Sequence, residues 1–119
     1  MSRPRIQTAF FVDSLIRNLN QAGFPTYVTQ KGYEQSGSLY VLVELPERMG
    51  RIFTREQDYE TDMQKWVCPV GSLEEVLEIE KLNDYTKRLK QRDSDCWIIE
   101  VEDFQNRLAI PYENEIWPE

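Results

Sequence analysis

The sequence predicts a single α+β domain, in which an N-terminal helix precedes a strongly bent antiparallel meander and a second helix is inserted before a last hairpin. Three observations predict it: apolar residues at helical spacing near the start, short β-rich segments separated by turn residues, and a helix-capping motif in the second half. A length of 119 residues suits one domain with its own core. We assign residues 1–111 to this domain and residues 112–119 to a C-terminal tail.

The first element is an α-helix over residues 9–22. Its apolar side chains recur three and four positions apart, as expected for a helix with one buried face. Gly23 and Pro25 then supply a typical C-terminal stop.

Short strands follow the first helix. The run Leu39 to Val43 is continuously apolar and is typical of a buried central strand, and turn residues separate it from its neighbours. We expect the first two strands to form a hairpin and all of them to form an antiparallel meander. The expected strands cover residues 26–31, 38–45, 51–55 and 64–69.

A second helix is expected to begin at Ser72. Ser72 and Glu75 have the spacing of a capping box, in which two side chains bond the free backbone groups of the first turn. The apolar residues that follow recur at every third position, so their stripe drifts by about 60° per step. Such a stripe predicts a kink near Asn83 and Asp84, a curved sheet beneath the helix, or a partner subunit around it. The stripe consists of Leu73, Val76, Ile79, Leu82 and Tyr85.

The last strand is expected over residues 96–102, where Trp97 alternates inward and Glu100 and Glu102 point to the other, largely solvated face. A turn and residues 107–110 would complete a hairpin.

Two segments together resemble a known family. Residues 91–103 place five carboxylates and Trp97 around one short strand, and residues 31–41 run Lys-Gly-Tyr-Glu-Gln-Ser-Gly-Ser-Leu-Tyr-Val. In combination they resemble the bacterial family called domain of unknown function 1491, found mainly in alphaproteobacteria, over residues 9–107. The family usually has Asp where this chain has Tyr33. The resemblance implies no activity, substrate or catalytic residue.

Composition excludes several classes of function. The chain has no histidine, which removes Ser-His and Cys-His nucleophile pairs and imidazole zinc sites. A net charge of −7 opposes binding to nucleic acid and to anionic membranes. Cys68 and Cys96 are expected as reduced thiols in a cytoplasmic protein. We expect no cofactor and no membrane span.

Few residues suggest a site. Asp95, Glu100 and Asp103 could offer oxygen ligands to a cation, although turns and a solvated strand face explain them more simply. The basic residues 87–92 suit the C-terminal end of a helix. The tail places Tyr112, Ile116 and Trp117 close to the terminus as candidate interaction residues.

We therefore expect a non-enzymatic cytoplasmic interaction module that binds a protein partner or self-associates. A helix leading into a curled meander is similar to the Sm-like small barrels, so nucleic-acid binding is the alternative. A carboxylate metal-dependent enzyme is a third hypothesis.

Overall fold

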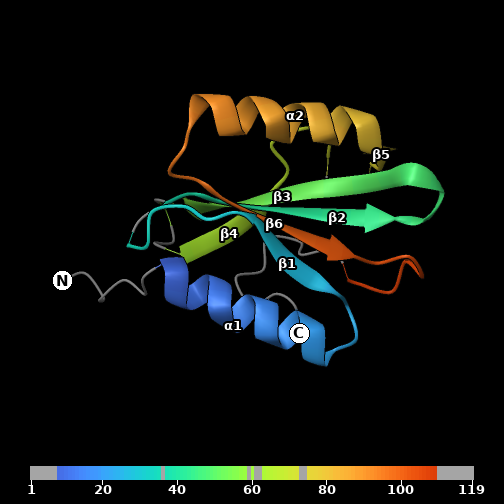
Figure 1. Cartoon of the computed structure of the whole chain (residues 1–119), viewed down its shortest axis with the longest axis horizontal. Coiled ribbons are helices and arrows are strands. Elements are labelled where there is room, and N and C mark those ends of the chain that lie inside the picture. Colours follow the sequence, from blue (N-terminus) through green and yellow to red (C-terminus); the bar gives the residue numbers. More distant parts are fainter. Residues whose placement is uncertain (1–7, 36, 59, 61–62, 73–74, 110–119) are drawn as a thin grey trace.

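The computed structural model describes residues 8–35, 37–58, 60, 63–72 and 75–109. Within them the chain forms a six-stranded sheet between two α-helices, which confirms the α+β class (Figure 1). The elements are α1 (Thr8–Gln21), β1 (Thr26–Gln30), β2 (Leu39–Leu45), β3 (Met49–Asp58), β4 (Met63–Val67), β5 (Leu77–Glu78), α2 (Ile79–Arg92) and β6 (Trp97–Glu102).

The strand order is β1-β6-β2-β3-β4, with β5 paired to β3. Strands β2, β3 and β4 form the expected antiparallel meander. The expected hairpin of β1 with β2 is wrong, because β6 lies between them, antiparallel to β1 and parallel to β2. Ile98 and Ile99 are both buried although they point to opposite faces, and this two-sided burial suits a central strand.

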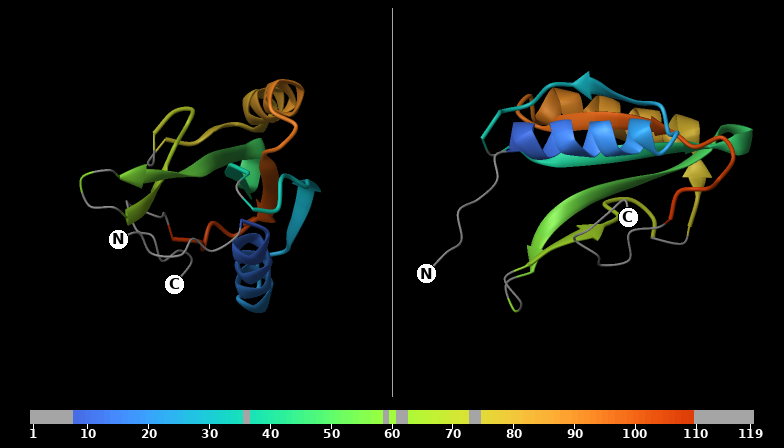
Figure 2. Two further views of the ribbon diagram at one scale, coloured as in Figure 1. Left: turned by 90° about the vertical axis from the view of Figure 1, so that its left-hand side faces the viewer. Right: turned by 90° about the horizontal axis from the view of Figure 1, so that it is seen from below.

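The sheet bends strongly but stays open (Figure 2). Strands β1 and β4 stand at the two ends of the strand order, and no pairing among the described strands joins them. The sheet has the expected strong bend, but it is not closed into a barrel.

The two helices cover opposite faces of the sheet, as Figures 1 and 2 both show. Helix α1 buries Val12, Leu15 and Leu19 in the larger core. Helix α2 buries Ile79 and Leu82 in a smaller cluster on the other face. Neither described helix has the length and apolar content that a membrane crossing needs. The sheet residues of the larger core include Val41, Val43, Phe53, Trp66, Trp97, Ile99 and Val101.

Helix α2 begins later than the capping motif predicts. The Ser72 hydroxyl does accept a hydrogen bond from the Glu75 backbone N–H at 3.2 Å, but the helix starts only at Ile79. Residues 77 and 78, which precede the helix, instead form the short strand β5, in which Leu77 pairs with Gly50 of β3. Gly50 is needed there, since a Cβ would lie 2.7 Å from the Val43 carbonyl oxygen and 2.9 Å from Leu82.

The late start also removes the drifting stripe. Val76 precedes the helix, Leu73 lies outside the described residues, and α2 is one unbroken helix. Its buried side chains have ordinary helical spacing, so neither a kink nor a partner subunit is required. These side chains are Ile79, Leu82, Thr86 and Leu89.

The segment after β6 turns instead of forming a second strand of a hairpin. Asp103 is 2% exposed, and its carboxylate accepts the backbone N–H groups of Arg107 at 2.8 Å and Leu108 at 2.9 Å. Such hydrogen bonds stabilise a turn, and they occupy backbone N–H groups that a strand would use to pair with its neighbour. The expected strand over residues 107–110 is therefore wrong for its described part, residues 107–109.

Candidate functional site

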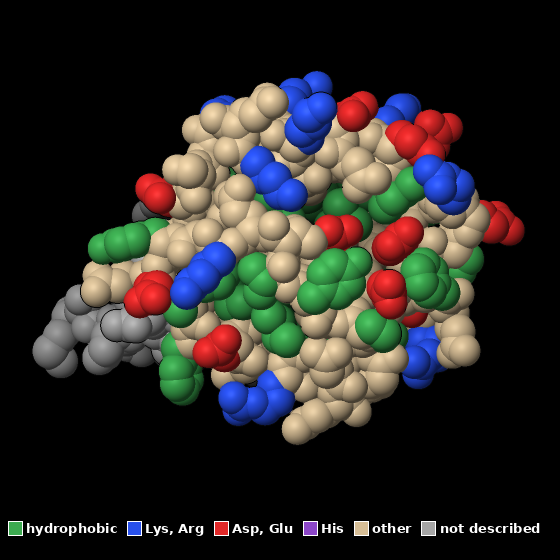
Figure 3. Space-filling model, in the orientation of Figure 1, with side chains coloured by type: hydrophobic (Ala, Val, Ile, Leu, Met, Phe, Trp, Pro, Cys, Tyr) green, Lys and Arg blue, Asp and Glu red, His purple; other side chains and the backbone are tan. Residues whose placement is uncertain are grey.

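The outer edge of β1 is a sheet edge that carries two large exposed side chains. Strand β1 pairs with β6 on one side only. Tyr27 and Val28, neighbours in the chain that point to opposite faces, are 45% and 40% exposed. Figure 3 views the molecule from this side and shows hydrophobic side chains across the middle, with acidic side chains among them towards the right.

On this edge, the outward backbone groups of Thr26 are hydrogen-bonded to a side chain, whereas those of Val28 are not. The Pro25 carbonyl accepts the Glu102 N–H at 2.9 Å, so by the alternation of an antiparallel ladder Thr26 and Val28 direct their N–H and C=O groups outward. The side-chain amide of Asn20 bonds both outward groups of Thr26, at 3.1 and 3.3 Å. No described residue does the same for Val28. A bulge between Val28 and Gln30 ends the regular pairing with β6.

Three carboxylates lie beside Tyr27 on the face that carries α2. Tyr27 stands opposite Glu100 of β6, and Glu102 of β6 stands opposite Glu44 of β2. Burial and the charges of Glu100, Glu102 and Glu44 raise the pKa of Tyr27. Burial, Glu44 and Glu102 raise the pKa of Glu100, and Lys90 opposes them. The cluster therefore carries excess negative charge.

A groove of about 190 Å³ continues this surface past the start of β1. Phe104, which is 54% exposed, lines it together with Pro25 and Glu102. Arg107 also lines it, and its guanidinium lies 4.9 Å from the centre of the Phe24 ring. The groove thus joins apolar walls to one carboxylate of the cluster.

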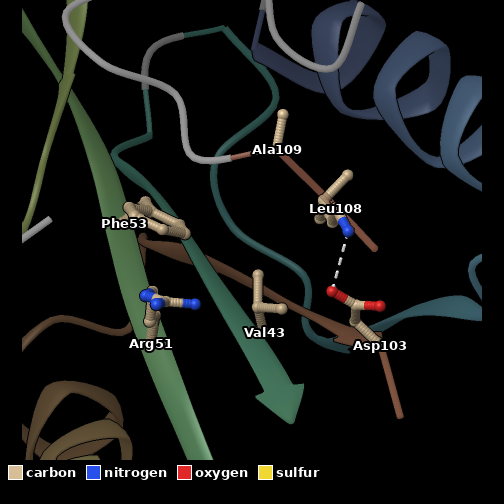
Figure 4. A pocket seen from close by; sticks show the side chains of 6 residues that line it. All are labelled: Val43, Arg51, Phe53, Asp103, Leu108 and Ala109. Carbon is tan, nitrogen blue, oxygen red and sulfur yellow. Dashed lines mark hydrogen bonds between the residues drawn. The ribbon is translucent and has the colours of Figure 1, made fainter. Parts of the chain in front are cut away.

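A second hollow lies inside the bend of the sheet, between Arg51 and Phe53 of β3 and the segment after β6 (Figure 4). Its volume is about 10 Å³, close to that of one water probe, so it holds no substrate. Figure 4 shows the Asp103 carboxylate engaged with the Leu108 backbone.

The carboxylates predicted from sequence do not converge. Asp95 and Asp103 lie beyond opposite ends of β6, and Glu100 lies between them on the α2 face. Among the described residues no three His, Cys, Asp or Glu side chains are arranged to hold a metal ion. Glu100 and Glu102 are half-buried, so the expectation that they are largely solvated is wrong.

The other sequence candidates contribute little to this surface. Lys87, Arg88 and Lys90 are exposed on α2, where Lys90 belongs to the last turn as expected. Cys68 and Cys96 are free thiols. The tail candidates Tyr112, Ile116 and Trp117 lie outside the described residues.

Sequence reasoning missed Asn20, Tyr27, Val28, Glu44 and Phe104. The sequence does show that residues 26–30 carry no charge, which is typical of a strand. This pattern does not distinguish an edge strand, where Tyr27 and Val28 are exposed, from a central one. That distinction depends on where β6 inserts.

The two motif segments meet at Trp97. Its indole N–H donates to the Tyr33 carbonyl at 2.9 Å, and the Tyr33 N–H donates to the Asp95 carbonyl at 2.9 Å. A Cβ on Gly32 or on Gly37 would overlap the Asp95 carbonyl oxygen. The Gly and Trp positions therefore form one packing unit, which is structural and lies apart from the β1 edge.

Comparison with known proteins agrees with this architecture. A crystal structure of a DUF1491 family protein from Caulobacter crescentus is 28% identical, with a TM-score of 0.69 over 83% of this chain and 89% of that one. An NMR structure of a DUF1491 family protein from the same organism is 27% identical, with a TM-score of 0.72 over 94% of this chain and 100% of that one.

The solution structure of protein Atu0922 from A. tumefaciens shares the fold at 21% identity, with a TM-score of 0.69 over 98% of this chain and 99% of that one. No curated protein matches the chain. The family model described as protein of unknown function (DUF1491) matches residues 6–110. That match spans both motif segments and every described helix and strand, and the chain belongs to the DUF1491 family.

Proposed function

We propose that the protein is a small, non-enzymatic interaction module of the cytoplasm that binds a protein partner at the edge of β1. One observation carries the proposal: the outward N–H and C=O groups of Val28 have no hydrogen-bond partner among the described residues, and they lie between exposed Tyr27 and the end of the strand. Exposed strand edges pair readily with another chain, and proteins usually cover them.

The surroundings of Val28 support this use of the edge. Asn20 closes the edge at Thr26, so the open part is short and defined. Tyr27 and Val28 add exposed apolar area on the two faces beside this edge, and Phe104 lines the groove that continues past the start of β1. Apolar groups around a free strand edge are typical of sites where a peptide adds to a sheet.

Catalysis has less support. The chain has no histidine, the candidate carboxylates Asp95, Glu100 and Asp103 are spread along β6, and that of Asp103 is engaged by backbone groups. The larger of the two hollows is an open groove with a single cluster carboxylate, Glu102. Nothing in this set pairs a nucleophile with a base.

Nucleic-acid binding also has less support. The exposed aromatic side chain of Tyr27 lies among carboxylates, which repel phosphates. None of the exposed aromatic side chains in the described residues belongs to α2, so its basic residues are not interleaved with aromatic rings on which bases could stack.

The experiment is affinity capture from cells with three forms of the full chain: wild type, Val28→Pro and Val28→Thr. Proline removes the outward N–H without breaking a bond to β6, whereas threonine keeps both the N–H and the side-chain shape. We expect partners that wild type and Val28→Thr retain and Val28→Pro loses. If all three forms retain the same proteins, the edge of β1 is not the binding surface.

A further inference from the structure

We propose that the partner presents an extended, basic segment, which adds to β1 as a strand and places Lys or Arg side chains beside Tyr27, Glu100 and Glu102. This inference rests on the proposed function and specifies the chemistry of the partner. It follows from the bond pattern at Val28, the direction of side chains on an added strand, and the unbalanced charge next to Tyr27.

The first step is the backbone. A strand added to β1 can exchange hydrogen bonds with the outward N–H and C=O of Val28 only, because Asn20 occupies those of Thr26 and the bulge follows Val28. Few ladder bonds are therefore available. Most of the affinity must come from side chains, and these decide which segments bind.

The second step is direction. Side chains on a strand alternate between the faces, and neighbouring strands lie about 4.8 Å apart. Every second side chain of the added strand therefore lies on the face of Tyr27 and Glu100, about 5 Å from Tyr27 and about 10 Å from Glu100. A Lys or Arg side chain spans this gap and passes the Tyr27 ring, where a cation is attracted.

The third step is charge. Burial first, and then the charges of Glu100, Glu102 and Glu44, raise the pKa of the Tyr27 hydroxyl, and among the described residues Lys90 is the cation that lowers the pKa of Glu100. None of these three carboxylates forms an ion pair within 4.0 Å with a described residue. A partner that brings positive charge to this face compensates them, and a neutral or acidic partner does not.

The groove beside Phe104 extends the same pattern. Pro25 and Phe104 can cover the aliphatic stem of a Lys or Arg side chain while Glu102 receives its charged head. The cation already present, Arg107, is stacked on the Phe24 ring.

A second copy of this chain fits the edge less well. Residues 26–30 carry no basic side chain, and the next residue, Lys31, is paired with Glu34 at 3.9 Å. Two copies joined at β1 would each add a net charge of −7 to the assembly without compensating the carboxylates. The charge therefore favours another protein.

The test uses a display library of random short peptides selected on the immobilised full chain, with binders measured as synthetic peptides. We expect enriched sequences with Lys or Arg at alternate positions and no proline at the centre. Val28→Pro should weaken their binding about tenfold, as expected for a lost ladder bond and a steric block. The double variant Glu44→Gln/Glu102→Gln should weaken it about two- to tenfold at low salt.

The matched control is Glu56→Gln/Glu78→Gln, which makes the same change in net charge at exposed residues of β3 and β5 and should leave binding unchanged. Enriched peptides that lack basic residues but still lose binding with Val28→Pro would overturn this inference and keep the proposed function. If the enriched peptides bind Val28→Pro as well as wild type, both the inference and the proposed function are wrong. Both are also wrong if no peptide is enriched and all three Val28 forms capture the same partners. A dimer of the full chain that Val28→Pro dissociates would overturn the inference in favour of a second copy.

Discussion

The indole N–H of Trp97 donates to the backbone carbonyl of Tyr33 at 2.9 Å, and this bond joins the loop between β1 and β2 to the start of β6. The Trp97 backbone N–H donates to the Ser38 carbonyl on the same side. Trp97 is thus a core side chain, 5% exposed, and its hydrogen bonds also hold the loop between β1 and β2 against the start of β6.

Replacing Trp97 should separate these two roles. Trp97→Ala should lower the free energy of unfolding by about 3 to 5 kcal/mol through lost burial and a cavity. Trp97→Phe keeps an aromatic ring but leaves the Tyr33 carbonyl without its donor, and should cost about 1 to 3 kcal/mol. Chemical denaturation followed by circular dichroism measures both. A Trp97→Phe variant as stable as the wild type would contradict the role of the hydrogen bond.

The glycines that face Trp97 should tolerate no side chain. Gly32→Ala and Gly37→Ala each force a methyl group against the Asp95 carbonyl, and we expect each to cost about 1 to 3 kcal/mol. Gly71→Ala is the comparison: its Cβ would have ordinary contacts, with Leu77 Cδ1 at 3.4 Å, and only its φ of +75° opposes alanine. Melting temperatures should therefore fall more for Gly32→Ala and Gly37→Ala than for Gly71→Ala.

Proline should distinguish the edge of the sheet from its centre. Val28→Pro removes an N–H that points away from β6 and should cost about 1 kcal/mol or less. Val41→Pro lies in β2, which pairs on both sides, and should cost about 3 kcal/mol or more. The measurement is denaturation of both variants under the same conditions. A similar loss of stability for both variants would show that the Val28 N–H does not point away from β6.

Glu100 should make a small contribution to the pH dependence of stability. Burial first, then Glu44 and Glu102, raise its pKa above the ordinary 4.5, so the folded state binds this proton more tightly than the unfolded state. Stability from this group is therefore lost as pH rises from 4.5 through the raised pKa. Glu100→Gln should remove that loss and gain up to about 0.5 kcal/mol near neutral pH, with little change in acid. A destabilised Glu100→Gln at neutral pH would contradict this sign.

Self-association through residues 112–119 stays a prediction from sequence, since Tyr112, Ile116 and Trp117 are outside the described residues. If the tail joins two copies, light scattering should give the full chain about twice the mass of a form ending at Pro111. A monomeric mass for the full chain at tens of micromolar would refute it.

Much of the fold could be predicted from local patterns. The helical spacing over residues 9–22 and the alternation around Trp97 each gave the correct element, because both depend on neighbours in the chain. Local patterns failed where distant residues compete. Ser72 and Glu75 form their local bond, yet pairing of β5 with β3 extends the chain and delays α2.

The candidate site could not be predicted in the same way. Tyr27 and Val28 are exposed because β1 lies outside β6, and their own sequence resembles that of a strand with partners on both sides. The carboxylates of Glu44 and Glu102 become neighbours only through the parallel pairing of β2 with β6. Strand order depends on contacts between distant segments, and the local pattern within each strand carries little information about it.

The position of β6 also determines when the sheet can form. As the last of the described strands, β6 separates β1 from β2, so β1 lacks its partner in the described sheet until residues 97–102 have left the ribosome. Until then β2 has an unpaired side and Val41 and Val43 lack their β6 neighbours. Contacts between such distant segments slow folding and leave strand edges open to aggregation during synthesis. A stop codon before Trp97 should therefore give an insoluble product, even though it removes a fifth of the chain or less.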